Sequence, residues 1–291
     1  MPRIRANGTE LHYHTQGRGT PIVFLHPPCI GSRVFTYLRN DLGRDHRTVA
    51  ADFRGHGFSA PSAAPLTVPL LAEDVRALLD ALDLPSAYLV SYSMGNLVSL
   101  EALLAYPQRF RGAALLSGLP EVADPRTRAK TVAAIWALRL KARGWVSFPI
   151  NWVNADIPET YFRLRDEIRA GDSRNWREYL QAALRYSATD RLSRIRQPML
   201  LMCGERDAVF RNYARMMHER LANSRVAVIP GARHNLPTRA ADEVAALIRA
   251  WIRAQEGAAL DRKGENAGAG PNAGVAMPDE AVREEASPIL R

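Results

Sequence analysis

The sequence predicts an α/β fold in which helices flank a mostly parallel β-sheet. Three observations support this prediction: apolar, β-branched runs alternate with helical periodicity, one strand turns abruptly into a helix at Ser93, and the alternation is interrupted once. Such alternation favours parallel strands joined by right-handed helical crossovers. With 47% hydrophobic and 24% charged residues, the composition is that of a globular protein and excludes a chain that is disordered throughout.

The expected elements follow one another in the order that such a sheet needs. An antiparallel hairpin is expected to turn at Asn7-Gly8, and further apolar runs complete an eight-stranded sheet. The hairpin is expected at 2–16, the other strands at 21–25, 47–51, 87–91, 112–117, 198–204 and 225–229, and helices at 33–42, 68–83 and 94–106.

The alternation stops after the sixth strand. From there to Pro198 no clear strand is visible, but apolar residues such as Val132 and Ile135 recur at helical spacing. The last part of the chain is rich in Gly, Ala, Asn and Glu and has few apolar residues, which is typical of disorder. We expect a sheet domain at 1–120 and 197–256, a helical insertion at 121–196 and a disordered tail at 257–291.

The turn Ser91-Tyr-Ser-Met-Gly95 carries the most specific chemical signal. A buried strand is expected to end here, and helical periodicity begins almost at once. A strand that turns this sharply into a helix holds its central residue in a strained conformation, with the side chain standing above the sheet. Ser93 occupies that position at the positive N-terminus of a helix, so we expect it to be a nucleophile.

Polar groups follow two later strands at the points where these strands end. Glu205 and Asp207 come directly after one strand, and His234 lies just beyond the next. Ligands bind at the carboxyl edge of an open parallel sheet, so these groups are expected near Ser93. Among the seven histidines, only His234 follows a late strand and a candidate acid. His12 lies in an expected edge strand, which favours a surface position.

These motifs resemble those of the α/β-hydrolase fold family. The turn at Ser93 looks like the family's nucleophile elbow, with Ser91 in place of the usual first glycine, and the Ser, acid and His candidates follow in the family's order. The segment Asp52-Phe-Arg-Gly-His-Gly-Phe-Ser59 is similar to a turn found in many members, where a structural role is expected. The resemblance covers residues from about 10 to 255.

The resemblance implies a serine hydrolase with a helical cap over a catalytic triad. His234 would be the general base that activates Ser93, and Asp207 would orient the imidazole. Some family members place the acid after the sixth strand instead, so Asp124 and Glu121 remain alternatives to Asp207.

The segment His26-Pro27-Pro28-Cys29 departs from the family's pattern at the expected oxyanion loop. The family motif reads His-Gly followed by the residue that donates its N–H, whereas neither proline has an N–H to donate. Met94, which follows the nucleophile, is expected to supply the first oxyanion donor. The second is expected at Cys29 or beyond.

The insertion is basic and rich in tryptophan. The chain has a net charge of +9, and residues 121–196 contain 15 Lys and Arg against 9 Asp and Glu, a difference of +6. This excess is consistent with a solvated basic surface or with attraction of anionic substrates or of an acidic partner surface. Four of the five tryptophans lie here; Trp136, Trp145 and Trp152 are expected to line an apolar substrate pocket or to form the core of the insertion.

Other sequence features indicate the expected location, cofactors and partners of the protein. The chain shows no run of 18 apolar residues and no N-terminal leader, so stable membrane insertion is not expected. The two cysteines, Cys29 and Cys203, suggest reduced thiols and a cytoplasmic location. We expect no metal and no cofactor, since neither metal-ligand spacing nor a phosphate-binding loop is present. Nucleic acid is not an expected partner, and a homodimer stays open.

We therefore expect an enzyme that hydrolyses a carboxylic ester or related acyl bond in a small apolar molecule. Carbon–carbon bond cleavage, or acyl transfer to an acceptor other than water, would use the same triad and is the enzymatic alternative. A ligand-binding protein with weak turnover is a third possibility, favoured by Pro27 and Pro28 in the expected oxyanion loop.

Overall fold

The computed structural model describes residues 2–268 and contains one eight-stranded sheet. The strand order is β1-β2-β4-β3-β5-β6-β7-β8, in which only the β1–β2 and β2–β4 pairs are antiparallel. The expectation of a mostly parallel, eight-stranded sheet is confirmed. The strands are β1 (Arg3–Ala6), β2 (Thr9–Gln16), β3 (Pro21–Leu25), β4 (Arg47–Ala51), β5 (Ala87–Tyr92), β6 (Phe110–Leu116), β7 (Met199–Gly204) and β8 (Ser224–Ile229).

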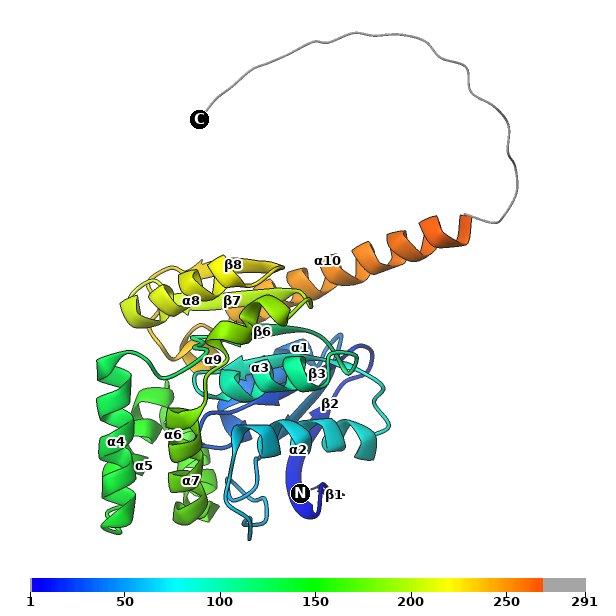
Figure 1. Cartoon of the computed structure of the whole chain (residues 1–291). Helices are drawn as coiled ribbons and strands as arrows, with labels where there is room; N and C mark the ends of the chain where they lie inside the picture. Colours follow the sequence, from blue (N-terminus) through cyan, green and yellow to red (C-terminus); the bar gives the residue numbers. More distant parts are fainter. Residues whose placement is uncertain (1, 269–291) are drawn as a thin grey trace, which may run out of the picture. The chain divides into compact units, whose positions relative to one another are not determined.

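Helices connect the parallel strands as the alternation predicted. In the view of Figure 1, α2, α3 and α8 lie in front of the sheet, and α3 packs on β5 and β6. The connecting helices are η1 (Ser32–Phe35), α1 (Thr36–Leu42), α2 (Val68–Ala81), α3 (Gly95–Ala105) and α8 (Ala208–Arg220), and α9 (Leu236–Arg239) and α10 (Ala241–Gly268) follow the last strand.

Four α-helices and a short 3₁₀ helix follow β6 and precede β7, where the alternation was expected to stop. Asp124 caps the first of them by accepting the Thr127 N–H at 2.8 Å, and Pro125 supplies its first residue. The four α-helices stand side by side below the sheet in Figure 1. They are α4 (Pro125–Arg139), α5 (Gly144–Asn154), α6 (Pro158–Ala170) and α7 (Ser173–Arg185); together with η2 (Thr189–Arg194) we refer to them as the insertion.

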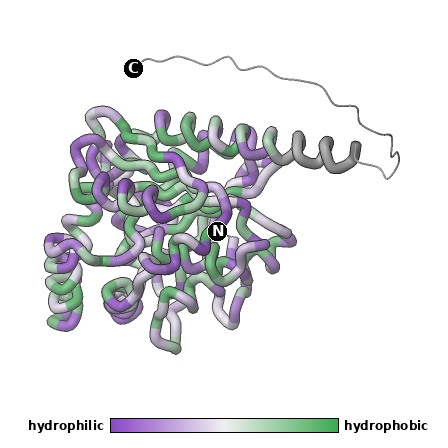
Figure 2. The backbone as a smooth tube through the Cα atoms, turned by 45° about the horizontal axis from the view of Figure 1, so that its top comes forward, coloured by the Kyte–Doolittle hydropathy of each residue, from purple (hydrophilic) through white to green (hydrophobic). Residues whose placement is uncertain are grey.

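The core lies in the central parallel strands. Every residue of β5 and β7 is buried, as expected for strands that are covered on both faces. Figure 2 colours the backbone by hydropathy, with hydrophobic segments in green. The expectation that His12 lies at the surface is wrong, because the turn that begins at Asp52 covers this face of β2, Phe58 packs on the His12 ring, and His12 is fully buried.

The chain divides into two compact units, Met1–Ile252 and Arg253–Arg291, and the first contains both the sheet and the insertion. The α10 helix ends at Gly268, so its last residues are helical where we expected the disordered tail from 257. The remainder of that expected tail, 269–291, lies outside the described residues. Among residues 2–268, no helix has the length and apolar character needed to span a membrane.

Candidate active site

Ser93 sits in a strained turn between β5 and α3. Its φ of +52° lies in the left-handed region, a conformation that non-glycine residues adopt only where the surroundings enforce it. The Ser93 N–H donates to the Leu116 carbonyl of β6 at 2.9 Å. A Cβ added at Gly95 would lie 2.4 Å from the Leu25 carbonyl oxygen, so only glycine allows the helix to begin this close to β3.

Ser93, His234 and Asp207 form a continuous hydrogen-bonded chain. The His234 Nε2 lies 3.1 Å from the Ser93 Oγ, and the His234 Nδ1 lies 2.9 Å from the Asp207 Oδ2. The carboxylate can only accept, so Nδ1 carries the proton and Nε2 presents its lone pair to the serine hydroxyl. The His234 side chain is 31% exposed and that of Asp207 13%, so the histidine is the more accessible of the two.

Neighbouring elements fix the position of the imidazole. Asp207 follows β7 at the start of α8, and His234 lies in the loop between β8 and α9. The rings of Phe210 and Tyr92 lie 4.3 and 5.3 Å from the His234 ring, and the Ser117 hydroxyl donates to the His234 carbonyl at 3.0 Å. The histidine is therefore held by both side-chain packing and a main-chain anchor.

The other candidate acids are engaged elsewhere. Glu205 accepts the Gly231 N–H at 2.7 Å, and Glu121 accepts the Thr189 hydroxyl at 2.9 Å. Asp124 caps α4 and accepts the hydroxyl of Tyr213 at 3.0 Å. Of the four carboxylates considered from the sequence, the structure brings Asp207 to His234.

His26 stiffens the segment that contains the two prolines. Its Nδ1–H donates to the Pro27 carbonyl at 2.9 Å, and its Nε2 accepts the Phe53 N–H at 2.8 Å. Burial lowers the pKa of His26, which keeps the ring neutral, as this pattern requires.

Cys29 follows the two prolines in a left-handed conformation, with φ of +68°. Its thiol is buried, and burial raises the pKa of the thiol far above its usual value. Cys29 is therefore a protonated, inert side chain near neutral pH. Its main-chain N–H as the second oxyanion donor, and that of Met94 as the first, stay predictions.

Two buried carboxyl groups hold the segment after Cys29. Asp52 accepts the Ser32 N–H at 2.7 Å and the His12 Nδ1–H at 2.8 Å. Burial alone would raise the pKa of Asp52, but these hydrogen bonds outweigh it and lower the pKa far below its usual value. Glu167 of α6 accepts the Arg33 N–H at 3.1 Å. Burial and the nearby Asp52 charge raise the pKa of Glu167 well above its usual value.

A polar network next to the triad was not found by sequence reasoning. The Tyr92 hydroxyl donates to the Asn154 Oδ1 at 3.2 Å, and the Asn235 Nδ2 donates to that hydroxyl at 3.1 Å and to Asn154 at 3.0 Å. Tyr92 precedes Ser93 and Asn235 follows His234 in the sequence, and this proximity to the triad could have marked them as candidate site residues. Asn154 comes from α5 and has no such signal in the sequence.

Three of the four tryptophans of the insertion are exposed. Trp136, Trp145 and Trp152 are 54%, 82% and 65% exposed, so they do not form the core of the insertion, and their role in lining a substrate pocket stays a prediction. Trp176 of α7 is almost completely buried instead and supplies part of the core. Helical periodicity predicted the helices but could not tell which apolar face would be covered.

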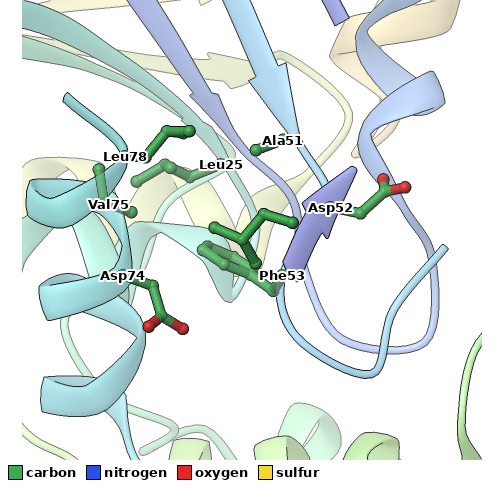
Figure 3. Close-up of a pocket in the computed structure, with 8 residues that line it drawn as sticks. Leu25, Ala51, Asp52, Phe53, Asp74, Val75 and Leu78 are labelled. Carbon is green, nitrogen blue, oxygen red and sulfur yellow. The ribbon is translucent and has the colours of Figure 1, made fainter. Parts of the chain in front are cut away.

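A small pocket beside Asp52 is lined by residues that hold the fold together and not by residues of the triad. Asp52 and Asp74 lie on opposite sides of Phe53 in Figure 3. Asp74 accepts from the Arg54 Nε at 2.6 Å, which supports the structural role expected of Arg54. No triad residue lines this pocket. Its lining residues are Leu11, Leu25, Ala51, Asp52, Phe53, Asp74, Val75 and Leu78.

Known proteins share both the sequence pattern and the fold. Residues 20–237 match the family model described as alpha/beta hydrolase fold. A human serine hydrolase is 24% identical over 258 residues (86% of each chain), and 3-oxoadipate enol-lactonase 2 of Acinetobacter baylyi is 26% identical over 219 residues (71% of this chain and 79% of that protein).

The same fold is found among solved structures. An esterase from Exiguobacterium antarcticum superposes with a TM-score of 0.78 at 22% identity and covers 86% of this chain and 98% of that one. At this identity the likeness concerns the fold alone. The family match spans most of the chain and includes the elbow, the carboxylate and the histidine described above. The chain therefore belongs to the α/β-hydrolase fold family.

Proposed function

We propose that this protein is a serine hydrolase that cleaves a carboxylic ester or a related acyl bond in a small, largely apolar molecule. The observation that carries the proposal is the hydrogen-bonded chain from Asp207 through His234 to Ser93, whose serine occupies the strained turn. A serine hydroxyl is a weak nucleophile at its ordinary pKa and needs an adjacent, oriented base. The enol-lactonase among the similar proteins supports an ester-type bond.

In the proposed reaction, the His234 Nε2 removes the Ser93 proton as the Oγ attacks the carbonyl carbon of the substrate. Asp207 holds the proton of Nδ1 and stabilises the imidazolium that forms. The tetrahedral intermediate collapses when the imidazolium protonates the leaving group, which leaves an acyl group on Ser93. Water, deprotonated by the same histidine, then attacks the acyl-serine and restores the free enzyme.

We propose the main-chain N–H groups of Met94 and Cys29 as the oxyanion donors. Met94 is the N-cap residue of α3, the helix that follows the nucleophile, and amide hydrogens at a helix N-terminus have no partner within the helix. Cys29 is the first residue after the two prolines that has an N–H. The hydrogen bonds of His26 to the Pro27 carbonyl and the Phe53 N–H support a rigid loop before Cys29. Oxyanion stabilisation requires donors that are held in place in this way.

The apolar character of the proposed substrate follows from the surroundings of the triad. The rings of Phe210 and Tyr92 pack against the imidazole, so a substrate that approaches His234 meets aromatic rather than charged groups. The charged side chain that forms a hydrogen bond with the His234 imidazole is Asp207. An uncharged acyl chain suits this environment better than an anionic group.

The test combines an active-site label with a substrate panel. A fluorophosphonate probe should modify Ser93 stoichiometrically, and p-nitrophenyl esters from acetate to decanoate should identify the preferred acyl length. Ser93→Ala should abolish labelling and turnover, whereas Ser147→Ala, a matched change of a serine in α5, should affect neither. Labelling of Ser93→Ala at the wild-type rate would refute the proposal.

We also propose a cytoplasmic location. Cys29 and Cys203 are both buried and unpaired, which suits a reducing compartment better than an oxidising one. Alkylation of the protein unfolded directly from cells should find both thiols free. A disulfide between two copies of the chain would contradict this location.

A further inference from the structure

An aromatic patch lies exposed on α5 and α6. Trp145, Phe148 and Trp152 are spaced i, i+3 and i+7 and therefore lie along one side of α5. The Phe148 and Trp152 rings stack with centroids 6.1 Å apart, and ring contacts continue from Trp152 to Tyr161 at 6.4 Å and on to Phe162 at 5.7 Å. We call these five residues the aromatic patch.

The exposed apolar residues of the described chain are concentrated on the insertion. Nine of its eleven exposed large hydrophobic residues lie between Val132 and Phe162, and the other two, Val226 and Val228, lie on β8. Contiguous exposed apolar surface of this kind marks an interaction site in a folded protein, whereas single exposed residues do not. The aromatic patch therefore calls for a partner surface.

The α4 side of the patch is cationic, whereas α6 carries acidic as well as basic residues. Residues 125–155, which include α4 and α5, contain no acidic residue and six basic ones. Arginine also contacts the exposed rings directly: the Arg139 guanidinium lies 5.0 Å from the Trp136 ring, and that of Arg165 lies 4.8 Å from the Phe162 ring. The six basic residues are Arg126, Arg128, Lys130, Arg139, Lys141 and Arg143.

We propose that the aromatic patch binds reversibly to the surface of a bilayer that contains anionic phospholipids. Tryptophan and phenylalanine side chains partition into the boundary between headgroups and acyl chains, and neighbouring Arg and Lys side chains attract lipid phosphates. A long basic side chain can reach the headgroups while its aliphatic part covers apolar surface. The binding is peripheral, because the aromatic side chains enter only the interface and no helix within residues 2–268 is long and apolar enough to cross the bilayer.

The charge pattern favours this occupant over a second copy of the chain. A symmetric dimer through the patch would bring the basic α4 helix and α4–α5 loop of one copy near those of the other. Like charges brought together in an interface oppose association. An anionic surface removes this repulsion and turns the exposed basic residues into attractive contacts; Arg143, which stacks on the buried Trp176 ring, is not among them.

The patch and the site are linked through α5. The α5 helix that carries Trp145 and Trp152 ends at Asn154, whose side chain binds Asn235 and Tyr92 beside the triad. Binding through α5 therefore brings the triad close to the lipid surface, where apolar esters accumulate. The membrane proposal itself concerns binding and stands independently of the proposed hydrolase activity.

The experiment is sedimentation of the full-length chain with vesicles of phosphatidylcholine alone or mixed with phosphatidylserine. We expect binding to the mixed vesicles that weakens with salt, and much weaker binding to phosphatidylcholine alone. Trp145→Ser/Phe148→Ser/Trp152→Ser should lower the partition coefficient on mixed vesicles by about tenfold or more. Val226→Ser/Val228→Ser, the matched control on β8, should bind as the wild type does.

Charge-reversal variants test the electrostatic attraction to lipid phosphates, and tryptophan fluorescence tests the entry of the aromatic side chains into the interface. Arg128→Glu/Lys130→Glu should remove most of the preference for phosphatidylserine, whereas Arg215→Glu/Arg220→Glu on α8 should retain more of it. Trp176 and Trp251 are buried, so a blue shift in tryptophan emission on binding reports mainly the three exposed tryptophans. The patch variant must keep the wild-type circular dichroism spectrum and should lose this blue shift.

Three outcomes would overturn the proposal. The first is absence of binding to mixed vesicles at millimolar lipid, and the second is equal binding by the patch variant. The third is a wild-type dimer in sedimentation velocity that the patch variant dissociates, without vesicle binding by either form. That last result would assign the patch to a second copy of the chain.

Discussion

Replacement of Asp207 by asparagine is the sharpest test of the triad. The Asp207 Oδ2 lies 2.9 Å from the His234 Nδ1 and accepts its proton, which leaves the Nε2 lone pair directed at Ser93. An asparagine of the same shape can turn its Nδ2–H₂ toward Nδ1. The imidazole would then carry its proton on Nε2 and could not act as a base toward the serine.

The expected loss is about four orders of magnitude in kcat/KM, or about 5.5 kcal/mol of transition-state stabilisation. The fold should tolerate the change, since Asp207 is partly accessible and the two side chains have nearly equal volumes. The assay is the hydrolysis of the preferred p-nitrophenyl ester, with the melting temperature measured alongside. Glu205→Gln is the matched control, and because Glu205 binds the Gly231 N–H instead of His234, kcat/KM should fall by less than about tenfold.

The reasoning would be refuted if Asp207→Asn kept kcat/KM within tenfold of the wild type. A strong effect of Asp124→Asn together with a silent Asp207→Asn would move the acid to the segment after β6. The structure makes the opposite prediction, because Asp124 caps α4 and binds Tyr213.

Three further changes test the groups around the triad. Glu167→Gln should remove a pH-dependent loss of stability, because folding raises the pKa of Glu167. The protonated carboxyl contributes fully to the free energy of unfolding below about pH 4.3, and this contribution is lost as the pH rises toward the folded-state pKa. The slope is up to about 1.4 kcal/mol per pH unit. Urea unfolding between pH 5 and 8 should show a flatter profile for the variant, and parallel profiles would contradict this. Asn154→Ala should lower the free energy of unfolding by about 1–3 kcal/mol, because the buried Tyr92 hydroxyl loses its acceptor, whereas Asn212→Ala on the surface of α8 should leave it nearly unchanged. Cys29→Ala should keep kcat within about tenfold, since a main-chain donor survives the change and the buried thiol is protonated; a larger loss would assign the thiol itself a role.

The triad could be found from the sequence because each of its members follows an apolar run. Ser93, Asp207 and His234 come just after β5, β7 and β8, and parallel strands bring such carboxyl ends to one edge of the sheet. The position of a strand end is a local property of the sequence. The common edge then follows from the parallel topology, which the alternation of strands and helices predicted.

Burial of individual side chains could not be predicted in the same way. The alternation along β2 indicates that His12 and His14 share one face of the strand, but the cover over that face comes from the distant turn that begins at Asp52. The periodicity of α4 and α5 likewise indicates apolar faces without saying whether another element covers them. Asn154 reaches the triad only because the insertion folds back onto the sheet edge.

The insertion contacts the site through polar and apolar residues that contribute differently. Glu167 binds the Arg33 N–H and Asn154 binds Asn235, but a hydrogen bond that water can replace adds only about 1 kcal/mol. Trp176 and Tyr179 of α7 are buried, and their rings contact that of His56 in the turn after β4.

Each such aromatic side chain contributes about 2–3 kcal/mol when it is removed from water. The apolar contacts of α7 therefore hold the insertion on the sheet, and the polar contacts of α5 and α6 set its register on the two loops of the site. A change that loosens α7 should detach the insertion as a whole. A change at Asn154 or Glu167 should instead shift the histidine loop or the segment after Cys29 while the insertion stays in place.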